Sequence, residues 1–385
     1  MEHRLFGTAE ILRMPTLMLR VLIRWWRKLF RHGILKSILI GVNGHSLQTL
    51  VIRTTSLTIQ DRGSKFSNNN QRVGLKGRRF SFYANNVKVS FVKQKVIAIV
   101  GPTASGKSAL GVFLAQKLNG EIISADSRQV YRGLDIGTGK VTKKEMGGIP
   151  HHLLDVASPK RQFSASDFEK LACKAIGKIA AKNKLPIVVG GTGFYVDSLL
   201  GRITLPDVPP NPKLRARLEK KSVEQLLAML QKKDPGRAQT IEPKHKRRLI
   251  RALEIAEALG TNPEPKTEDA YDVLWIGLSP EEAALKRKIR ARLLARMKAG
   301  MMNEAKKLHK SGLSYKRMKG LGLEYRSLAE YMLGEKTKEG MLASLEAAIR
   351  DYAKRQMRWF RRNPDIKWIS GKAEALRLAK AFISE

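Results

Sequence analysis

The fold of this chain is decided by Val96-Ile-Ala-Ile-Val-Gly101-Pro-Thr-Ala-Ser-Gly106-Lys107-Ser108. The apolar, β-branched run at its start is typical of a buried strand, and residues 108–118 after it favour a helix. Between them lies a G-x-x-x-x-G-K-S pattern, whose glycines let backbone N–H groups close around phosphate oxygens. The pattern therefore predicts a phosphate-binding loop (P-loop) for a diphosphate, with Lys107 as a point charge and Ser108 as a ligand for Mg²⁺.

Strand and helix patterns alternate after this loop, which predicts an α/β fold: a P-loop NTPase-like parallel sheet flanked by helices. Ligands of such sheets bind beyond the carboxyl ends of the strands, where Asp126 and the glycines of 190–193 are expected. The predicted strands are 96–100, 121–125, 185–189 and 273–277, and the predicted helices of this part are 108–118 and 168–182.

A Pro-rich segment, 205–212, interrupts the alternation and indicates an inserted helical region. Helical patterns follow at 213–221, 223–231 and 243–259, and basic helices at 280–310 precede a last helix at 338–362. We therefore divide the chain into a basic N-terminal extension, 1–93, the first part of the P-loop core, 94–205, the inserted helical region, 206–272, and the second part of the core with the C-terminal helices, 273–385.

The charge of the chain is strongly positive, because 73 Lys and Arg face 34 Asp and Glu, a net +39. Such an excess is typical of a protein with a polyanionic partner, although a basic tail contributes to the total. The single cysteine, Cys173, permits no intrachain disulfide and fits a reducing compartment.

The extension 1–93 contains three acidic residues and scattered Lys and Arg. Its apolar part, 17–40, is interrupted by six Arg and Lys and cannot span a bilayer. A membrane-surface helix, an organelle transit peptide and a start codon placed too far upstream are all consistent with this pattern. We favour the upstream start codon or plain disorder, and assign the extension no catalytic role.

A P-loop kinase carries an acidic residue at the end of an apolar strand, where it helps to hold Mg²⁺. The strand at 187–189 ends in glycines instead, and Asp126 is the acid that follows a predicted strand. Asp126 could bind a metal, but the neighbouring Ser127, Gln129 and Tyr131 are suited to reading the edge of a nucleobase. These residues alone leave both interpretations open.

Seven blocks of sequence follow one another in order between about Val96 and Ile369. They are Gly101-Pro-Thr-Ala-Ser-Gly-Lys-Ser108, Ile123-Ser-Ala-Asp-Ser-Arg-Gln-Val-Tyr-Arg-Gly133, Asp135-Ile-Gly-Thr-Gly-Lys140, Pro150-His-His-Leu-Leu-Asp155, Gly190-Gly-Thr-Gly-Phe-Tyr195, Arg247-Arg-Leu-Ile-Arg-Ala-Leu-Glu254 and Tyr352-Ala-Lys-Arg-Gln-Met-Arg-Trp-Phe-Arg361. With these seven blocks the chain resembles the tRNA dimethylallyltransferases.

The resemblance implies transfer of the dimethylallyl group from dimethylallyl diphosphate to N6 of adenosine 37, beside the tRNA anticodon. It implies the anticodon stem-loop of tRNA as partner, Mg²⁺ as cofactor at Ser108, and a cytoplasmic monomer without a membrane anchor. The diphosphate would be bound by Gly101, Pro102, Thr103, Ala104, Ser105, Gly106, Lys107 and Ser108.

The resemblance also assigns roles to single residues. Asp126 matches the general base, Thr103 matches a residue whose hydroxyl contacts the bridging oxygen of the donor, and Arg292 aligns with a diphosphate-binding arginine. Contacts with tRNA are implied for Asp126, Ser127, Arg128, Gln129, Thr192, Arg215, Arg247, Arg248, Leu249, Ile250 and Arg251.

One block departs from the family pattern: Glu324-Tyr325 stands where Gly-Tyr is usual, so the backbone path of 319–326 and its contacts with tRNA are open. Adjacent histidines, His151 and His152, would point to opposite faces of a strand, and no zinc is expected. The alternatives are an adenylate isopentenyltransferase, a small-molecule P-loop kinase and a non-enzymatic RNA-binding module. The long basic insertion favours a tRNA substrate over a free nucleotide.

Overall fold

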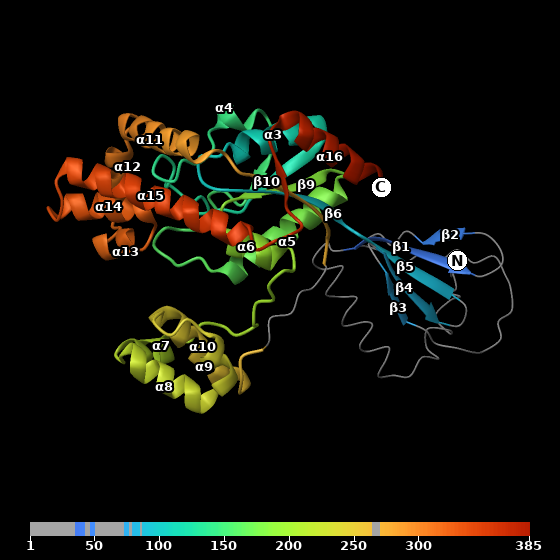
Figure 1. The fold of residues 1–385 in the computed structure, drawn as a ribbon, viewed down its shortest axis with the longest axis horizontal. Helices are drawn as coiled ribbons and strands as arrows, with labels where there is room; N and C mark the ends of the chain where they lie inside the picture. The colour runs from blue at the N-terminus through green and yellow to red at the C-terminus, as the bar shows by residue number, and fades with distance from the viewer. Residues whose placement is uncertain (1–34, 43–46, 51–72, 77–78, 85–86, 264–269) are drawn as a thin grey trace, which may run out of the picture. The chain divides into compact units, whose positions relative to one another are not determined.

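The computed structural model describes residues 35–42, 47–50, 73–76, 79–84, 87–263 and 270–385 (Figure 1). The chain forms two compact units, one made of Met1–Leu200 with Asp269–Glu385 and one made of Gly201–Glu268. The larger unit contains the P-loop, and the smaller one contains the predicted inserted helices.

The larger unit is built on a six-stranded sheet with the order β11-β10-β6-β9-β7-β8, in which every pair of neighbours is parallel. The predicted parallel α/β sheet is therefore confirmed. The two outermost strands, β8 and β11, are too short to give a sequence pattern and were not predicted. The strands are β6 Lys95–Val100, β7 Gly120–Ser124, β8 His151–His152, β9 Leu185–Gly190, β10 Asp272–Leu278 and β11 Lys367–Ile369.

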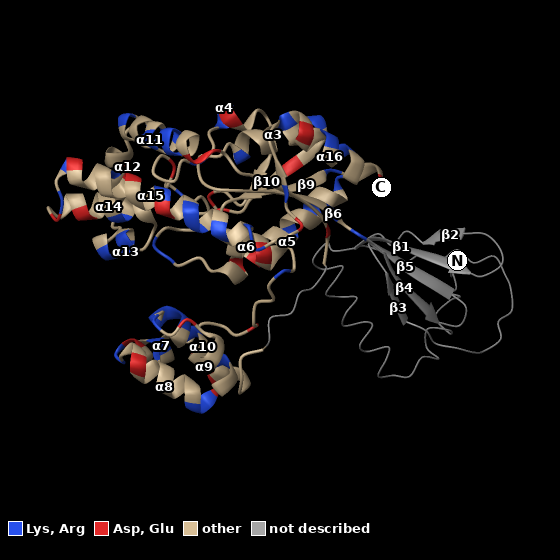
Figure 2. Cartoon of the chain, in the orientation of Figure 1, with Lys and Arg blue, Asp and Glu red and all other residues tan. Residues whose placement is uncertain are grey.

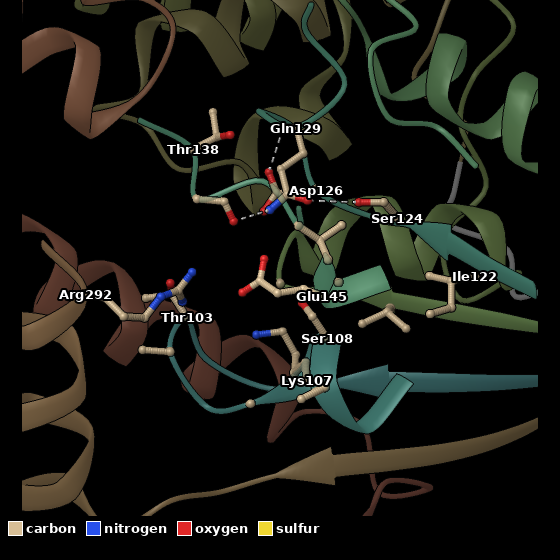
Figure 3. Close-up of a pocket in the computed structure, with 18 of the residues that line it drawn as sticks. Thr103, Lys107, Ser108, Ile122, Ser124, Asp126, Gln129, Thr138, Glu145 and Arg292 are labelled. Atoms are coloured by element: carbon tan, nitrogen blue, oxygen red, sulfur yellow. Dashed lines mark hydrogen bonds between the residues drawn. The ribbon is translucent and has the colours of Figure 1, made fainter. Parts of the chain in front are cut away.

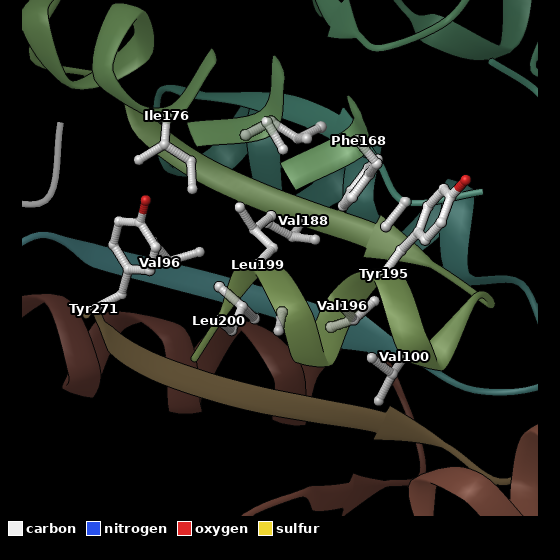
Figure 4. Packing of buried hydrophobic residues seen from close by; sticks show 14 of the residues in the cluster. Val96, Val100, Phe168, Ile176, Val188, Tyr195, Val196, Leu199, Leu200 and Tyr271 are labelled. Atoms are coloured by element: carbon white, nitrogen blue, oxygen red, sulfur yellow. The ribbon is translucent and has the colours of Figure 1, made fainter. Parts of the chain in front are cut away.

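Helices cover both faces of this sheet because alternate residues of the buried strands point in opposite directions. On one face, Val96 and Val100 pack with Phe168 of α5 and Val196 of α6 (Figure 4). On the other face, Ile97 and Ile99 of β6 pack against side chains of α3 and α16. The bounds of these helices are α3 Lys107–Lys117, α5 Ala165–Ala181, α6 Gly193–Leu199 and α16 Lys372–Ser384.

The remaining helices of the larger unit enclose a second apolar core centred on Tyr325, Met318 and Leu345. The basic helical stretch predicted at 280–310 is divided at Gly300, whose φ of 99° ends one helix and starts the next. The helix predicted as the last one is followed by α16. The bounds are α4 Lys143–Met146, α11 Glu282–Lys298, α12 Met301–Lys310, α13 Tyr315–Lys319, α14 Leu323–Met332 and α15 Lys338–Phe360.

In the described part of the smaller unit, residues 201–263, four helices surround a leucine-rich core that includes Leu218, Leu226, Leu230 and Leu249. Each of the three predicted helices is present, and a short helix, α9, lies between the last two. The bounds are α7 Pro212–Glu219, α8 Val223–Lys233, α9 Pro235–Thr240 and α10 Lys246–Leu259.

Five strands lie within the basic extension 1–93, in an antiparallel sheet with the order β2-β1-β5-β4-β3. The sequence pattern of the extension favours disorder or an upstream start codon, and it does not predict these strands. Residues 17–34 of the apolar segment lie outside the described residues, as do the other residues of the extension that are not in these five strands. The strands are β1 Leu35–Val42, β2 Leu47–Leu50, β3 Val73–Lys76, β4 Arg79–Ala84 and β5 Val87–Lys93.

A buried carboxylate links the edge of the main sheet to the end of α5. Glu121 of β7 is inaccessible to solvent and contacts Lys184 at 2.9 Å, His152 at 2.7 Å and Lys182 at 3.3 Å. Burial raises the pKa of Glu121, but the hydrogen bonds from these three side chains outweigh it and bring the pKa to about 2.

We predict that Glu121 contributes to acid stability. Its pKa is lower in the folded than in the unfolded chain, so its stabilisation is complete above pH 4.5 and is lost as the pH falls toward 2. Across this pH window, the free energy of unfolding of the parent protein should fall by up to about 3 kcal/mol more than that of Glu121→Gln. Urea unfolding of both proteins from pH 5 to pH 2.5 measures this, and parallel pH profiles would contradict the prediction.

Candidate active site

A cavity of about 450 Å³ opens at the carboxyl edge of the main sheet (Figure 3). It lies between the P-loop, the ends of β7 and β9, the loop after Leu134, and the helices α11 and α15. All of its residues belong to the larger unit. They are Thr103, Ala104, Gly106, Lys107, Ser108, Ala109, Ile122, Ser124, Asp126, Gln129, Thr138, Gly139, Val141, Glu145, His151, Val189, Gly190, Gly191, Arg292, Tyr352 and Gln356.

The P-loop keeps its shape through one tight glycine and one distant glutamine. Gly101 has φ of 144°, and a Cβ there would lie 2.6 Å from the carbonyl oxygen of Leu278 on the neighbouring strand β10, so only glycine fits. The backbone N–H of Thr103 donates to Oε1 of Gln356 at 2.8 Å. The amide Nε2 of Gln356 donates in turn to the carbonyl oxygen of Gly191 at 2.8 Å. The buried Gln356 thus joins the P-loop to the loop after β9.

Two cations face the cavity. The Nζ of Lys107 donates to the carbonyl oxygen of Pro102 at 2.5 Å, and Arg292 reaches in from α11 (Figure 3). Burial lowers the pKa of Lys107 to about 7, although Asp126 nearby partly opposes this by favouring the charged form. The first amides of α3 have no partners within the helix and point toward the same space. The site is therefore suited to an anion with several oxygens.

Asp126 lies opposite the P-loop and is fixed by its own backbone. Its Oδ1 accepts the N–H groups of Arg128 at 2.8 Å and Gln129 at 3.2 Å. The next residue, Ser127, donates its N–H to the hydroxyl of Thr192 at 3.0 Å, which ties this turn to the loop after β9. With Oδ1 held in this way, the carboxylate is oriented at the cavity wall and can accept a proton.

The structure brings most of the residues predicted for the P-loop site together at one cavity. Thr103, Ala104, Gly106, Lys107 and Ser108 line the cavity with Asp126, Gln129 and Arg292, while Gly101, Pro102 and Ser105 are the parts of the P-loop that do not line it. Ser127, Arg128 and Thr192 lie beside the cavity and do not line it. Sequence reasoning gave no role to Thr138, Gly139, Glu145, His151, Tyr352 and Gln356, which also line it.

A signal for two of these missed residues was present in the sequence. Tyr352 and Gln356 are four positions apart in one of the seven blocks, a spacing that puts both on one face of a helix. The burial of their helix against the P-loop was not readable from that spacing, because the partner surface lies far away in the chain.

The oxygen atoms at this site fit a magnesium ion that is also bound by phosphate. The hydroxyl of Ser108 and the carboxylates of Asp126 and Glu145 line the cavity. The described residues contain no cluster of three His, Cys, Asp or Glu that could hold a metal by itself. Mg²⁺ typically takes one or two protein ligands and completes its shell with substrate phosphates.

The basic residues predicted to contact tRNA in the smaller unit fall into two groups. Arg247 and Arg248 are exposed on α10. Arg215 and Arg251 instead form ion pairs with the buried carboxylate of Glu254, at 2.7 and 2.5 Å. Their guanidinium groups therefore stabilise the fold of this unit, and only about a third of each side chain is exposed.

Two of the residues predicted to contact tRNA have buried side chains. The side chains of Leu249 and Ile250 are buried in the leucine-rich core of the smaller unit, with exposures of 0% and 4%. They lie on the apolar face of α10, so they cannot present these side chains to RNA. The resemblance to the family implies tRNA contacts for the whole segment 247–251, whereas the helical period turns these two side chains inward. Figure 2 shows where the Lys and Arg of the described residues lie.

Glu324, the departure from the family pattern, has a helical position and an ionic partner in the structure. Glu324 lies in the first turn of α14, where a negative charge is favourable, and it forms an ion pair with Arg296 at 3.1 Å. Tyr325 is fully buried in the second apolar core. The loop before α14 contacts Arg128, which donates to the carbonyl oxygen of Gly320 at 3.4 Å.

The model of the family described as IPP transferase matches residues 129–363. The chain belongs to the IPP transferase family. This confirms the resemblance given by the seven blocks. Among curated members, tRNA dimethylallyltransferase 1 of Geotalea uraniireducens is 41% identical over 292 residues, which cover 75% of this chain and 96% of the relative.

Solved structures of the IPP transferase family agree with the fold. The full-length tRNA isopentenylpyrophosphate transferase of Bacillus halodurans is 38% identical with a TM-score of 0.57, covering 76% of this chain and 96% of that one. A eukaryotic dimethylallyltransferase acting on tRNA is 28% identical with a TM-score of 0.68, covering 76% of this chain and 80% of that one. The helices that the described residues contain include none long and apolar enough to cross a membrane.

We predict that anion binding at the P-loop takes up a proton. Because the pKa of Lys107 is about 7, the free protein loses this charge as the pH rises above 7, while a bound diphosphate favours the charged form. Affinity for inorganic pyrophosphate should therefore fall between pH 7 and pH 9, by at most about tenfold per pH unit for one proton.

Calorimetric titration in buffers of different ionisation enthalpy measures this proton uptake directly. Lys107→Arg serves as the comparison, because arginine stays charged throughout this range. Equal proton uptake by the parent protein and Lys107→Arg would show that another group titrates.

Proposed function

We propose that this protein is a tRNA dimethylallyltransferase: it transfers the dimethylallyl group of dimethylallyl diphosphate to N6 of adenosine 37, releasing pyrophosphate. The observation that carries this proposal is a carboxylate, Asp126, facing a P-loop across a cavity that Lys107 and Arg292 make positive. Membership of the IPP transferase family and the names of its curated members support the same activity.

In the proposed reaction, N6 of the adenine attacks the allylic C1 of the donor while the bond from C1 to the diphosphate oxygen breaks. The proton of N6 passes to the carboxylate of Asp126, whose Oδ1 is held by two backbone N–H groups. The nitrogen becomes strongly acidic only as the new C–N bond forms, and a carboxylate at this position can then accept its proton.

The leaving diphosphate gains negative charge in the transition state, so donors already in place around it lower the barrier. Lys107, Arg292 and the amides at the start of α3 provide such donors, and Thr103 is assigned to the bridging oxygen. The bond from Gln356 to the N–H of Thr103 fixes this part of the loop before the donor arrives. Mg²⁺, when bound at Ser108, would neutralise part of the diphosphate charge.

The target base must leave the stacked anticodon loop to reach Asp126, since the cavity lies below the surface. Gln129 lines the cavity beside Asp126, and its side chain amide donates to the carbonyl oxygen of Gly139 at 3.4 Å. We assign tRNA binding to Ser127, Arg128 and Thr192 at the rim, and to the exposed Arg247 and Arg248 of the smaller unit. A cytoplasmic monomer is the expected state.

The alternative functions differ from the proposed one in the group transferred or in the acceptor. A P-loop kinase would transfer phosphate from ATP, and an adenylate isopentenyltransferase would need no surface for RNA. Exposed arginines on a separate helical unit favour a large polyanionic acceptor. Incubation of the protein with labelled dimethylallyl diphosphate, and either an anticodon stem-loop or AMP as acceptor, tests the proposal. Label transferred to AMP alone, or phosphate transferred from ATP, would overturn it.

We predict that Asp126→Asn loses prenyl transfer by about 10² to 10⁴ in rate, because the amide cannot take the N6 proton. Binding of the stem-loop should stay within about threefold, since shape and basic surface are retained. Single-turnover rates and filter binding measure the two effects. Asp351→Asn, an exposed site on α15, is the matched control and should behave like the parent. Turnover of Asp126→Asn close to that of the parent would exclude the assigned role.

A second prediction concerns the two groups of arginines. Arg247→Ala and Arg248→Ala should each weaken tRNA binding and reduce the slope of log K against log[salt] by roughly 0.7 to 0.9, if each removes one phosphate contact. Arg251→Ala should mainly destabilise the protein, because it leaves buried Glu254 with fewer partners.

Tm values and tRNA titrations at several salt concentrations separate these effects. Lys380→Ala, at an exposed position of α16, controls for the general loss of one positive charge. An unchanged slope in Arg247→Ala and Arg248→Ala would mean that these side chains are ordinary solvated charges.

A further inference from the structure

The segment Asp135–Lys140 is one of the seven blocks and has received no role so far. Two of its residues, Thr138 and Gly139, line the cavity, although neither carries a charge. The segment makes hydrogen bonds of its own, from the N–H of Gly139 to the carbonyl oxygen of Ile136 at 3.0 Å and from the N–H of Lys140 to that of Asp135 at 2.9 Å. Its first three N–H groups find their support outside the segment.

The carboxylate of Glu304 supplies that support from the first turn of α12. Three consecutive backbone N–H groups converge on it: Asp135 at 3.0 Å and Ile136 at 2.8 Å on Oε2, and Gly137 at 2.9 Å on Oε1. A fourth donor, the hydroxyl of buried Tyr325, reaches Oε1 at 2.5 Å. Hydrogen bonds to a charged acceptor are stronger than those between neutral groups, so one side chain fixes three successive peptide units.

Gly137 is packed closely against Tyr325. A Cβ at this position would lie 2.6 Å from the hydroxyl of Tyr325, so the backbone passes directly over the tyrosine. On its other side, the carbonyl oxygen of Gly137 accepts a hydrogen bond of 2.7 Å from Arg296. The peptide units just before Thr138 are therefore held from two helices, α11 and α12, and from α14 through Tyr325.

The fixed loop contacts Gln129, which lines the cavity beside Asp126, and Arg292, which is assigned to the diphosphate. The carbonyl oxygen of Gly139 accepts from Gln129 at 3.4 Å, and a Cβ on Gly139 would lie 2.9 Å from the guanidinium of Arg292. Glu304 itself does not line this cavity. A shift of the loop would therefore displace a wall of the donor site and the space available to Arg292.

We propose that Glu304, together with Tyr325, is a positioning residue for the donor site: it holds the Asp135–Lys140 loop so that Thr138, Gly139 and Arg292 fit a diphosphate. The inference rests on the proposed function for the identity of the donor. Its geometry concerns only the binding of the diphosphate part. The two can therefore be tested separately.

The test compares the parent protein with Glu304→Gln and Tyr325→Phe. Glutamine keeps the shape of the side chain, but its NH₂ group opposes an N–H donor and its charge is gone. We expect affinity for inorganic pyrophosphate, measured by calorimetry, to fall about tenfold in Glu304→Gln and less in Tyr325→Phe, which keeps the carboxylate. Amide hydrogen exchange should increase in residues 133–140 of both variants.

The matched control is Glu335→Gln, because Glu335 is an exposed glutamate whose carboxylate pairs with Lys319 at 2.7 Å and not with the loop. It should bind pyrophosphate like the parent. If Glu304→Gln fails to fold, Tyr325→Phe carries the comparison. A lower Tm with unchanged pyrophosphate affinity and unchanged exchange in 133–140 would overturn the proposal, since it would indicate a purely structural role.

Activity assays add a separate result. With the stem-loop as acceptor, Glu304→Gln should raise KM for dimethylallyl diphosphate about tenfold and leave KM for the stem-loop unchanged. An equal rise in both KM values would contradict a role at the donor site. If the parent transfers no prenyl group at all, the proposed function fails, whereas the pyrophosphate comparison still decides the role of Glu304.

Discussion

The site depends on the parallel alignment of three neighbouring strands. Because β6 pairs with β9 and β9 with β7, all in the same direction, their carboxyl ends meet at one edge of the sheet. The P-loop follows β6, Asp126 follows β7, and Thr192 follows β9. One constraint of backbone pairing thus brings together a phosphate-binding loop, a carboxylate and a rim residue from three distant parts of the sequence.

Much of this edge could be predicted because its signals are local. The β-branched run before Gly101 predicts β6, the G-x-x-x-x-G-K-S pattern predicts the loop, and the position of Asp126 after an apolar strand places it on the same edge. Each inference needs only a few adjacent residues and a general rule about parallel sheets.

The supporting contacts could not be predicted in this way, because their partners are far apart in the chain. Gln356 is a polar residue in a basic helix, and its role appears only when α15 packs against Thr103 and Gly191. Glu304 reads as a charge on a solvated helix face until three loop amides are found to converge on it.

The roles of the arginines in the smaller unit also depend on a partner that only the structure shows. The resemblance to the family implies tRNA contacts for Arg215, Arg247, Arg248 and Arg251 alike, whereas in the structure the buried Glu254 pairs with Arg215 and Arg251.

The contact between Thr103 and Gln356 spans 253 positions of the chain. During synthesis the P-loop and its strand leave the ribosome long before α15 exists, so the nascent domain carries the phosphate-binding sequence without the amide that shapes it. The donor site is therefore completed by a helix that is made long after the P-loop. A chain arrested before Gln356 would have the P-loop sequence and lack its finished geometry.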